Sequence, residues 1–254
     1  MTSNVLRYII PQKYGENGPI IEALKLIISL HRKSNQSKEI TLLIPTKSQL
    51  NGTIIEASLG SARCKDLSSG HNVKVTENLS LKCETTRTIK SYSQTDIILC
   101  VFPSEKMLDL VDSVVGLEIA IIIPWIEKET DIWKKTWNPV ILGEKPSEPE
   151  DLIDNPVVEE AMKMLTRRVN LSTDLSHPND KGAAVEILRI LRNNRENFNP
   201  DALKSWALRN GWTPKGAENL RSYAQAIIEG KSIRGDSGAW KPNIIDILRE
   251  SVDK

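Results

Sequence analysis

Ile121-Ile122-Ile123-Pro124 is one of four apolar runs in the first half of the chain that end at a proline. The other three runs are Tyr8-Ile9-Ile10-Pro11, Leu42-Leu43-Ile44-Pro45 and Cys100-Val101-Phe102-Pro103. Proline has no N–H to donate to a strand ladder, and it biases the residue before it towards an extended backbone. Each run therefore predicts a buried strand that ends at its proline. Near-continuous apolar runs are typical of parallel strands, which are covered on both faces.

Helix-like segments follow three of these runs. The expected helices are residues 20–31, which begin after Pro19, residues 49–59, and residues 104–115, for which Ser104 is a suitable N-cap. This alternation predicts an α/β fold with a mainly parallel, Rossmann-like, doubly wound sheet. All four prolines would then lie on one edge of the sheet, which is the edge where such sheets bind ligands. Residues 60–95 show no clear pattern, although residues 72–75 could form a short strand.

The composition changes between residues 144 and 160, where seven acidic residues and one lysine accompany three prolines. This composition is typical of an exposed linker. We therefore predict an α/β domain over residues 1–145, an acidic linker over residues 146–156 and a smaller all-α domain over residues 157–254. The helices expected in the last part are residues 157–168, 181–193, 201–209, 215–229 and 243–252.

The overall composition argues against several classes of protein. Lys plus Arg number 34 and Asp plus Glu number 33, so no net charge attracts the chain to nucleic acid or to an acidic membrane. The three cysteines, Cys64, Cys83 and Cys100, have no metal-binding or redox spacing and favour a reducing compartment. The start of the chain lacks a secretory signal pattern, and the longest apolar stretch is too short to span a bilayer. We expect a cytoplasmic protein with no membrane partner.

A small-molecule ligand is the partner we expect first. Glycines, polar groups and an aromatic ring follow the predicted strands at the proline edge, and a polar loop of the helical domain could face them. We expect a small polar ligand, with nucleotides among the candidates, in a cleft between the two domains. The residues expected to bind it are Gly15, Gly18, Lys47, Ser104, Trp125 and Thr173. The cofactor stays unassigned, because neither GxGxxG nor GxxxxGK[ST] occurs.

The same residues also have structural interpretations. The two glycines could form an ordinary turn. Trp133 and Trp137 lie four residues apart on one side of a predicted helix, where they could pack against the sheet instead of holding a ligand. The fold class by itself specifies no reaction, because doubly wound sheets host many unrelated functions.

A second hypothesis is a hydrolase or a transferase. The densest polar cluster of the chain is residues 170–181, and it contains His177 between Asp174 and Asp180. Either carboxylate could orient His177 as a general base for a nearby hydroxyl. The alternative is N-capping, since such residues ahead of a proline are also typical of a helix start. We expect no metal site, because the three histidines are scattered.

A third hypothesis is a ligand-sensing DNA-binding regulator. Ala207, followed four residues later by Gly211, resembles the alanine and the turn glycine of helix-turn-helix DNA-binding modules. That resemblance implies that the second helix of the hairpin at residues 201–229 would present Lys215, Asn219 and Arg221 to nucleic acid. Asn210 stands where the pattern has an apolar residue. The alternative is an antiparallel helical hairpin that packs through its tryptophans.

Overall fold

The computed structural model describes residues 5–32, 36–89, 95–235 and 238–252. The chain divides into two compact units, Ser3–Glu148 and Pro149–Lys254, which we call the α/β unit and the helical unit. Across the described ranges, each helix is too short or too polar to cross a membrane.

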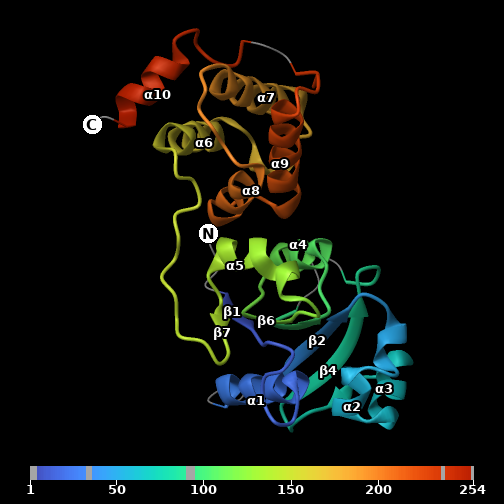
Figure 1. Cartoon of the computed structure of the whole chain (residues 1–254). Helices are drawn as coiled ribbons and strands as arrows, with labels where there is room; N and C mark the ends of the chain where they lie inside the picture. The colour runs from blue at the N-terminus through green and yellow to red at the C-terminus, as the bar shows by residue number, and fades with distance from the viewer. Residues whose placement is uncertain (1–4, 33–35, 90–94, 236–237, 253–254) are drawn as a thin grey trace. The chain divides into compact units, whose positions relative to one another are not determined.

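The α/β unit is built on a seven-stranded sheet with the order β3-β4-β2-β5-β6-β1-β7 (Figure 1). The strands are β1 Leu6–Ile9, β2 Lys38–Ile44, β3 Val73–Lys74, β4 Leu79–Thr85, β5 Ile97–Val101, β6 Ile119–Ile123 and β7 Val140–Ile141. Every neighbouring pair is parallel except β3 with β4, which is antiparallel. This arrangement confirms the predicted α/β class with a mainly parallel sheet.

The four prolines follow strands that run in the same direction. Strands β2, β5, β6 and β1 are successive parallel neighbours, with Ile40 opposite Ile97 and Ile97 opposite Ile119. Pro11, Pro45, Pro103 and Pro124 therefore lie at one edge of the sheet, the edge formed by the carboxyl ends of the strands.

Helices cover both faces of the sheet. They are α1 Pro19–His31, the 3₁₀ turn η1 Lys47–Leu50, α2 Ile54–Leu59, α3 Ser61–Ser68, α4 Glu105–Ser113, the 3₁₀ turn η2 Glu127–Thr130 and α5 Asp131–Trp137. Helices α1, α2 and α3 pack on one face, and α4 and α5 pack on the other (Figure 1). The unit is thus doubly wound, as the sequence predicts.

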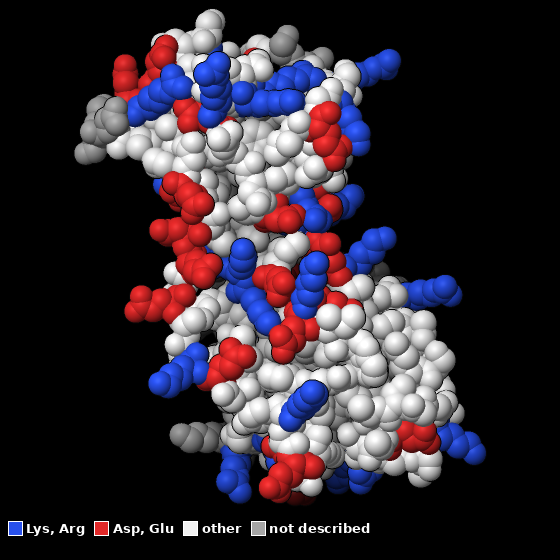
Figure 2. Space-filling view, in the orientation of Figure 1, with Lys and Arg blue, Asp and Glu red and all other residues white. Residues whose placement is uncertain are grey.

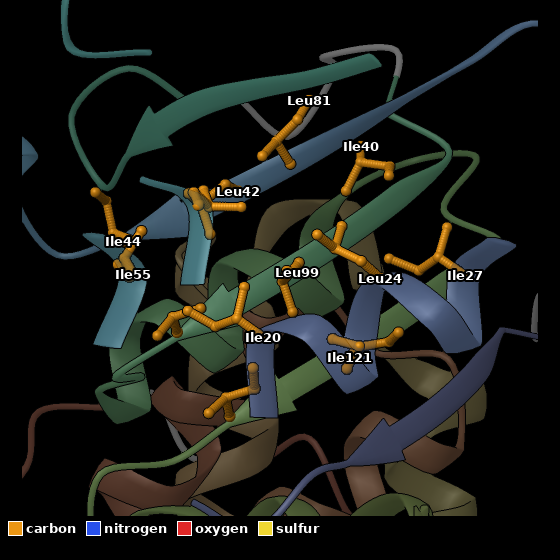
Figure 3. Packing of buried hydrophobic residues seen from close by; sticks show 14 of the residues in the cluster. Ile20, Leu24, Ile27, Ile40, Leu42, Ile44, Ile55, Leu81, Leu99 and Ile121 are labelled. Carbon is orange, nitrogen blue, oxygen red and sulfur yellow. The ribbon is translucent and has the colours of Figure 1, made fainter. Parts of the chain in front are cut away.

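Alternate side chains along the central strands fill two separate cores. Leu42, Leu99 and Ile121 belong to the core on the α1 and α2 side of the sheet, which also contains Ile20 and Leu24 of α1 and Ile55 of α2 (Figure 3). The next residue of each of these strands belongs to the second core, under α4 and α5. Both sets are completely buried, which explains why β5 and β6 have almost no polar residue.

Strand β4 lies in the segment that sequence analysis left unassigned. It pairs in register with β2 over its whole length, from Lys38 opposite Leu79 to Ile44 opposite Thr85. Its other neighbour is the two-residue strand β3, so much of β4 is near the side of the sheet and several of its side chains are only half-buried. Because these positions are partly exposed, they can hold polar residues, and these residues interrupt the apolar pattern from which a strand would be predicted. The short strand expected at residues 72–75 is present as β3.

The helical unit contains α6 Pro156–Arg168, the 3₁₀ turn η3 Leu171–Thr173, α7 Pro178–Asn193, α8 Pro200–Arg209, α9 Pro214–Ile228 and α10 Ile244–Val252. All five predicted helices are present. Helices α6, α7, α8 and α9 each begin with a proline, and each has a residue before it whose side chain accepts a hydrogen bond from the first turn. Those capping residues are Asn155, His177, Asn199 and Thr213.

Candidate functional site

An open cleft of about 760 Å³ lies at the carboxyl edge of the sheet. Its walls come from the segments that follow three neighbouring strands: η1 and α2 after β2, the residue after β5, and the turn after β6. The lining residues are Gln49, Gly52, Thr53, Ile54, Ala57, Phe102, Trp125 and Glu129.

The cleft coincides with a reversal in the direction of the chain. From β2 the chain passes through α2 and α3 to the β3–β4 side of the sheet, whereas from β5 it passes through α4 to β6, on the other side. These two connections lie on opposite faces of the sheet, so the loops after β2 and β5 diverge. Such a topological switch point is where open α/β sheets bind their ligands.

Two aromatic rings from different loops meet at the cleft. The ring of Phe102 contacts that of Trp125 edge-on, with centroids 5.2 Å apart and an interplanar angle of 78°. Trp125 is 58% exposed, which is unusual for a tryptophan in a folded domain. The pair therefore offers an accessible apolar surface directly at the strand ends.

Phe102 has a strained backbone. Its φ angle is 57°, in the left-handed region that bulky residues rarely adopt, at a cost of about 1–2 kcal/mol. Its N–H donates to the carbonyl oxygen of Ile123 at 3.0 Å, which continues the β5–β6 ladder by one residue before Pro103 ends it. The sheet thereby imposes the conformation that places the Phe102 ring against Trp125, and strain of this kind is concentrated at functional sites.

The polar groups of the cleft are acidic or neutral. Glu129 is its charged lining residue, and its carboxylate accepts a hydrogen bond from the N–H of Ile126 at 3.2 Å. The N–H of Gly52 donates to the carboxylate of Glu56 at 2.7 Å, so this backbone N–H is already bound to an anionic side chain. Gln49 Oε1 is buried and lacks a partner among the described groups. The cleft therefore suits a neutral or cationic ligand better than an anionic one.

Of the predicted ligand-binding residues, Trp125 lines this cleft. Lys47 follows β2, but its ammonium group donates to the carbonyl oxygen of Ser68 at 2.8 Å. Ser104 precedes α4 and its side chain makes no capping hydrogen bond. Neither belongs to the lining. Thr173, in the helical unit, donates to Asp180 at 2.7 Å. A ligand-binding role for Lys47, Ser104 and Thr173 stays a prediction, as does the cleft between the domains.

Gly15 and Gly18 form the turn that enters α1. Both have positive φ angles, 80° and 81°, and the N–H of Gly18 donates to the carbonyl oxygen of Gly15 at 3.3 Å. A Cβ atom on Gly15 would lie 2.3 Å from Cγ of Glu22, so the carboxylate-bearing side chain of α1 already fills the space beneath this turn. These observations explain both glycines by backbone geometry, and their binding role stays a prediction.

The three predicted catalytic residues have separate partners. Nδ1 of His177 accepts the N–H of Asn179 at 3.3 Å as the N-cap of α7. Asp174 accepts the hydroxyl of Thr213 and forms an ion pair with Lys215 at 3.4 Å. Asp180 accepts the hydroxyl of Thr173. No hydrogen bond joins His177 to either carboxylate in the part of the chain that the structure describes. The N-capping interpretation explains this arrangement, and catalysis stays a prediction.

The three predicted nucleic-acid-binding residues of α9 also contact the protein itself. Asn219 donates to the carbonyl oxygen of Asp174 at 2.7 Å, Lys215 pairs with the same residue, and Nε of Arg221 lies 2.6 Å from Asp201 of α8. From residue 161 to the end, the chain has 16 basic and 11 acidic residues. Lys and Arg side chains gather on the helical unit around α7 (Figure 2). Nucleic-acid binding by α9 stays a prediction.

A buried ionic cluster that the sequence did not predict lies under α4 and α5. Asp112 accepts the indole N–H groups of Trp133 and Trp137 at 3.1 and 2.9 Å, and it pairs with Arg7 at 3.5 Å. The Arg7 guanidinium lies 3.7 Å from the centre of the Trp137 ring. Burial raises the pKa of the Asp112 carboxyl to about 6, although Arg7 and the two indoles oppose the rise. Both tryptophans thus pack against the sheet, which is the structural alternative to holding a ligand that the sequence left open.

Comparisons with known proteins give a family likeness for the helical unit without a function. Residues 154–249 match the model of a family described as a domain of unknown function, DUF1889. No curated protein matches the chain. A crystal structure of a protein from Salmonella typhimurium has 21% sequence identity with it and covers 38% of this chain and 96% of that one, with a TM-score of 0.34. Neither description names a ligand or an activity.

Proposed function

We propose that the α/β unit binds a small molecule with a flat ring in the cleft at the carboxyl ends of β2, β5 and β6. The observation that carries this proposal is the contact between Phe102 and Trp125 at the topological switch point of the sheet. A volume of about 760 Å³ is in the range of small-molecule sites.

The exposed indole of Trp125 supports a planar ligand. A ring stacked on an aromatic side chain gains about 1–3 kcal/mol, as measured for nucleic-acid bases by alanine substitution. Trp125 extends from its loop with 58% of its surface exposed, and its contact with Phe102 limits its orientation. The site therefore needs little rearrangement before a ring can stack there.

The charges of the cleft favour recognition of the ring itself. Glu129 could accept hydrogen bonds from a ring amino group, and Gln49 could both donate and accept. None of the eight lining residues is a lysine or an arginine. Within the nucleotide-like class, we therefore expect a nucleoside or a free base to bind at least as well as the corresponding nucleotide.

A calorimetric titration of the full chain with the four ribonucleosides and their 5′-monophosphates tests this proposal. We expect at least one nucleoside to bind, and Trp125→Ala to weaken its binding by at least about fivefold, the lower end of the stacking energy. Val115→Ala is the matched control, since Val115 is an exposed apolar residue of the same unit that does not line the cleft.

Two outcomes would contradict the proposal in different ways. Binding that Trp125→Ala leaves unchanged, or the absence of binding by every compound, would overturn the ring site. Binding of monophosphates alone would retain a ligand but overturn the charge argument. Lys47→Ala and Ser104→Ala would then test whether these two predicted residues bind the phosphate.

A further inference from the structure

We propose that the helical unit has a second, polar site, which binds a small zwitterion of the amino-acid type. The site is a cavity of about 500 Å³ between the end of α6, the first turns of α7 and the segment before α10. It lies within the helical unit and does not depend on the cleft of the α/β unit.

The cavity has charged groups of opposite sign in its walls and small residues between them. Arg168 comes from α6, Asn179 and Asp180 come from α7, and the small wall residues include Gly182 and Ala183. Both of these residues are small, so the wall that α7 contributes has no long side chain at these two positions. The polar groups and the space are therefore contributed by elements that the fold brings together.

Arg168 is an exposed residue whose guanidinium contacts an aromatic ring. Its guanidinium lies over the ring of Trp240, 5.2 Å from the centre, and the indole N–H of Trp240 donates to the carbonyl oxygen of Ala183 at 2.9 Å. The N–H groups of a guanidinium lie in its own plane. A contact between the guanidinium and an aromatic face therefore leaves these groups able to donate hydrogen bonds. Arg168 is therefore positioned to bind a carboxylate with two parallel hydrogen bonds.

Among the residues that the structure describes, one oxygen of the Asp180 carboxylate accepts a hydrogen bond from another side chain. Its Oδ2 accepts the hydroxyl of Thr173 at 2.7 Å, which orients the carboxylate. Arg168 and Asp180 form no ion pair with each other among the residues that the structure describes, although both line the same cavity. Two opposite charges that share a cavity without neutralising each other fit a ligand with both a carboxylate and an ammonium group.

The side-chain amide of Asn179 adds a neutral donor and acceptor to the same wall. The cavity volume is large enough for an amino acid or a dipeptide. A ligand with only one charge would form a charge-assisted hydrogen bond with only one of Arg168 and Asp180, so it would bind more weakly than a zwitterion that pairs with both. We therefore expect the site to discriminate strongly between zwitterions and their singly charged derivatives.

Nuclear magnetic resonance of the ¹⁵N-labelled full chain tests this inference with the common L-amino acids and glycylglycine as probes. A bound zwitterion should shift the Trp240 indole signal and the amide signals of Gly182 and Ala183. The best probe is then compared with its N-acetylated form and its carboxamide form, each of which removes one charge. We expect both forms to bind at least about tenfold more weakly.

Three variants assign the contacts. Arg168→Met and Asp180→Asn should each weaken the zwitterion at least about tenfold. Arg167→Met, which changes the neighbouring exposed arginine outside the cavity, is the control and should change nothing. The inference is overturned if no probe shifts these signals at concentrations up to about 10 mM. It is equally overturned if the acetylated and amidated forms bind as well as the zwitterion, or if the three variants behave alike.

Discussion

Proline ends strands and begins helices in this protein, and the two units use these roles in different proportions. In the α/β unit Pro11, Pro45, Pro103 and Pro124 follow strands and only Pro19 begins a helix in the described residues, whereas in the helical unit four prolines begin helices. One physical property explains both roles, because the missing N–H is tolerated just beyond a strand and in the first turn of a helix. The residue before the proline differs, since an apolar residue precedes each of the four strand-ending prolines and a capping residue precedes each of the four helix prolines of the helical unit.

This difference shows where polar side chains are available for function. In the helical unit Asn155, His177, Asn199 and Thr213 accept backbone N–H groups, so much of the polar sequence there serves to start helices. In the α/β unit the strand ends collect on one edge, where Trp125 stays exposed. The polar residues before the helix prolines are therefore explained by capping, whereas capping does not explain the exposed Trp125.

The largest effect we expect comes from breaking the buried polar cluster of the α/β unit. Asp112→Ala removes the partner of Arg7 and of both indole N–H groups, and leaving a buried charge unpaired costs about 3–5 kcal/mol. Denaturant unfolding of the full chain, followed by tryptophan fluorescence, measures this loss. A loss below about 1 kcal/mol would show that the cluster is not maintained in solution.

The pH dependence of the same cluster gives the next effect. The pKa of Asp112 rises from 3.8 to about 6 on folding. At 1.36 kcal/mol per pKa unit, this rise contributes up to about 3 kcal/mol to the free energy of unfolding at low pH. The folded state retains this proton where the unfolded state releases it, so the contribution is full below pH 4 and is lost as the pH rises through about 6. Asp112→Asn has no such proton. The difference in unfolding free energy between wild type and this variant should therefore fall from pH 4 to pH 7, and a constant difference would contradict the assignment.

How far the sequence determines these features depends on how local their causes are. Strands β5 and β6 were predictable because every residue of each is buried, which requires an apolar run. Strand β4 was not, because Leu79 and Leu81 alternate with polar residues and only pairing with β2 assigns the segment to the sheet. The burial of Asp112 could not be predicted either, because a carboxylate on a helix is usually solvated. Its two tryptophan partners lie more than twenty residues away along the chain.

The candidate site was predictable in part for the same reason. Trp125 was identifiable because it directly follows a strand proline. Phe102 was not, because its left-handed backbone results from a hydrogen bond to Ile123 of the neighbouring strand. Gln49 and Gly52 reach the cleft only because the chain reverses direction between β2 and β5. Strand order is a tertiary property, and a single sequence does not specify it.

The N-caps of α8 and α4 allow a direct comparison between the two units. Asn199 accepts the N–H of Asp201 at 2.8 Å at the start of α8, whereas Ser104 makes no side-chain cap at the start of α4. Asn199→Ala should therefore lower the free energy of unfolding by about 1 kcal/mol, and Ser104→Ala should leave it nearly unchanged. Chemical denaturation measures both. Equal losses for the two variants would contradict the contrast between the units.

The smallest effect we expect is at His177, and it separates capping from catalysis. Its hydrogen bond to the N–H of Asn179 is long, at 3.3 Å, so His177→Ala should cost only about 0.5 kcal/mol. His177→Asn should recover this loss or exceed wild type, because asparagine is among the best N-cap residues. Melting temperatures of the three proteins test the order Ala, His, Asn. If asparagine instead destabilises the chain as much as alanine does, then the imidazole has a role that capping does not explain, and His177 becomes a stronger candidate for the general base of the hydrolase or transferase hypothesis.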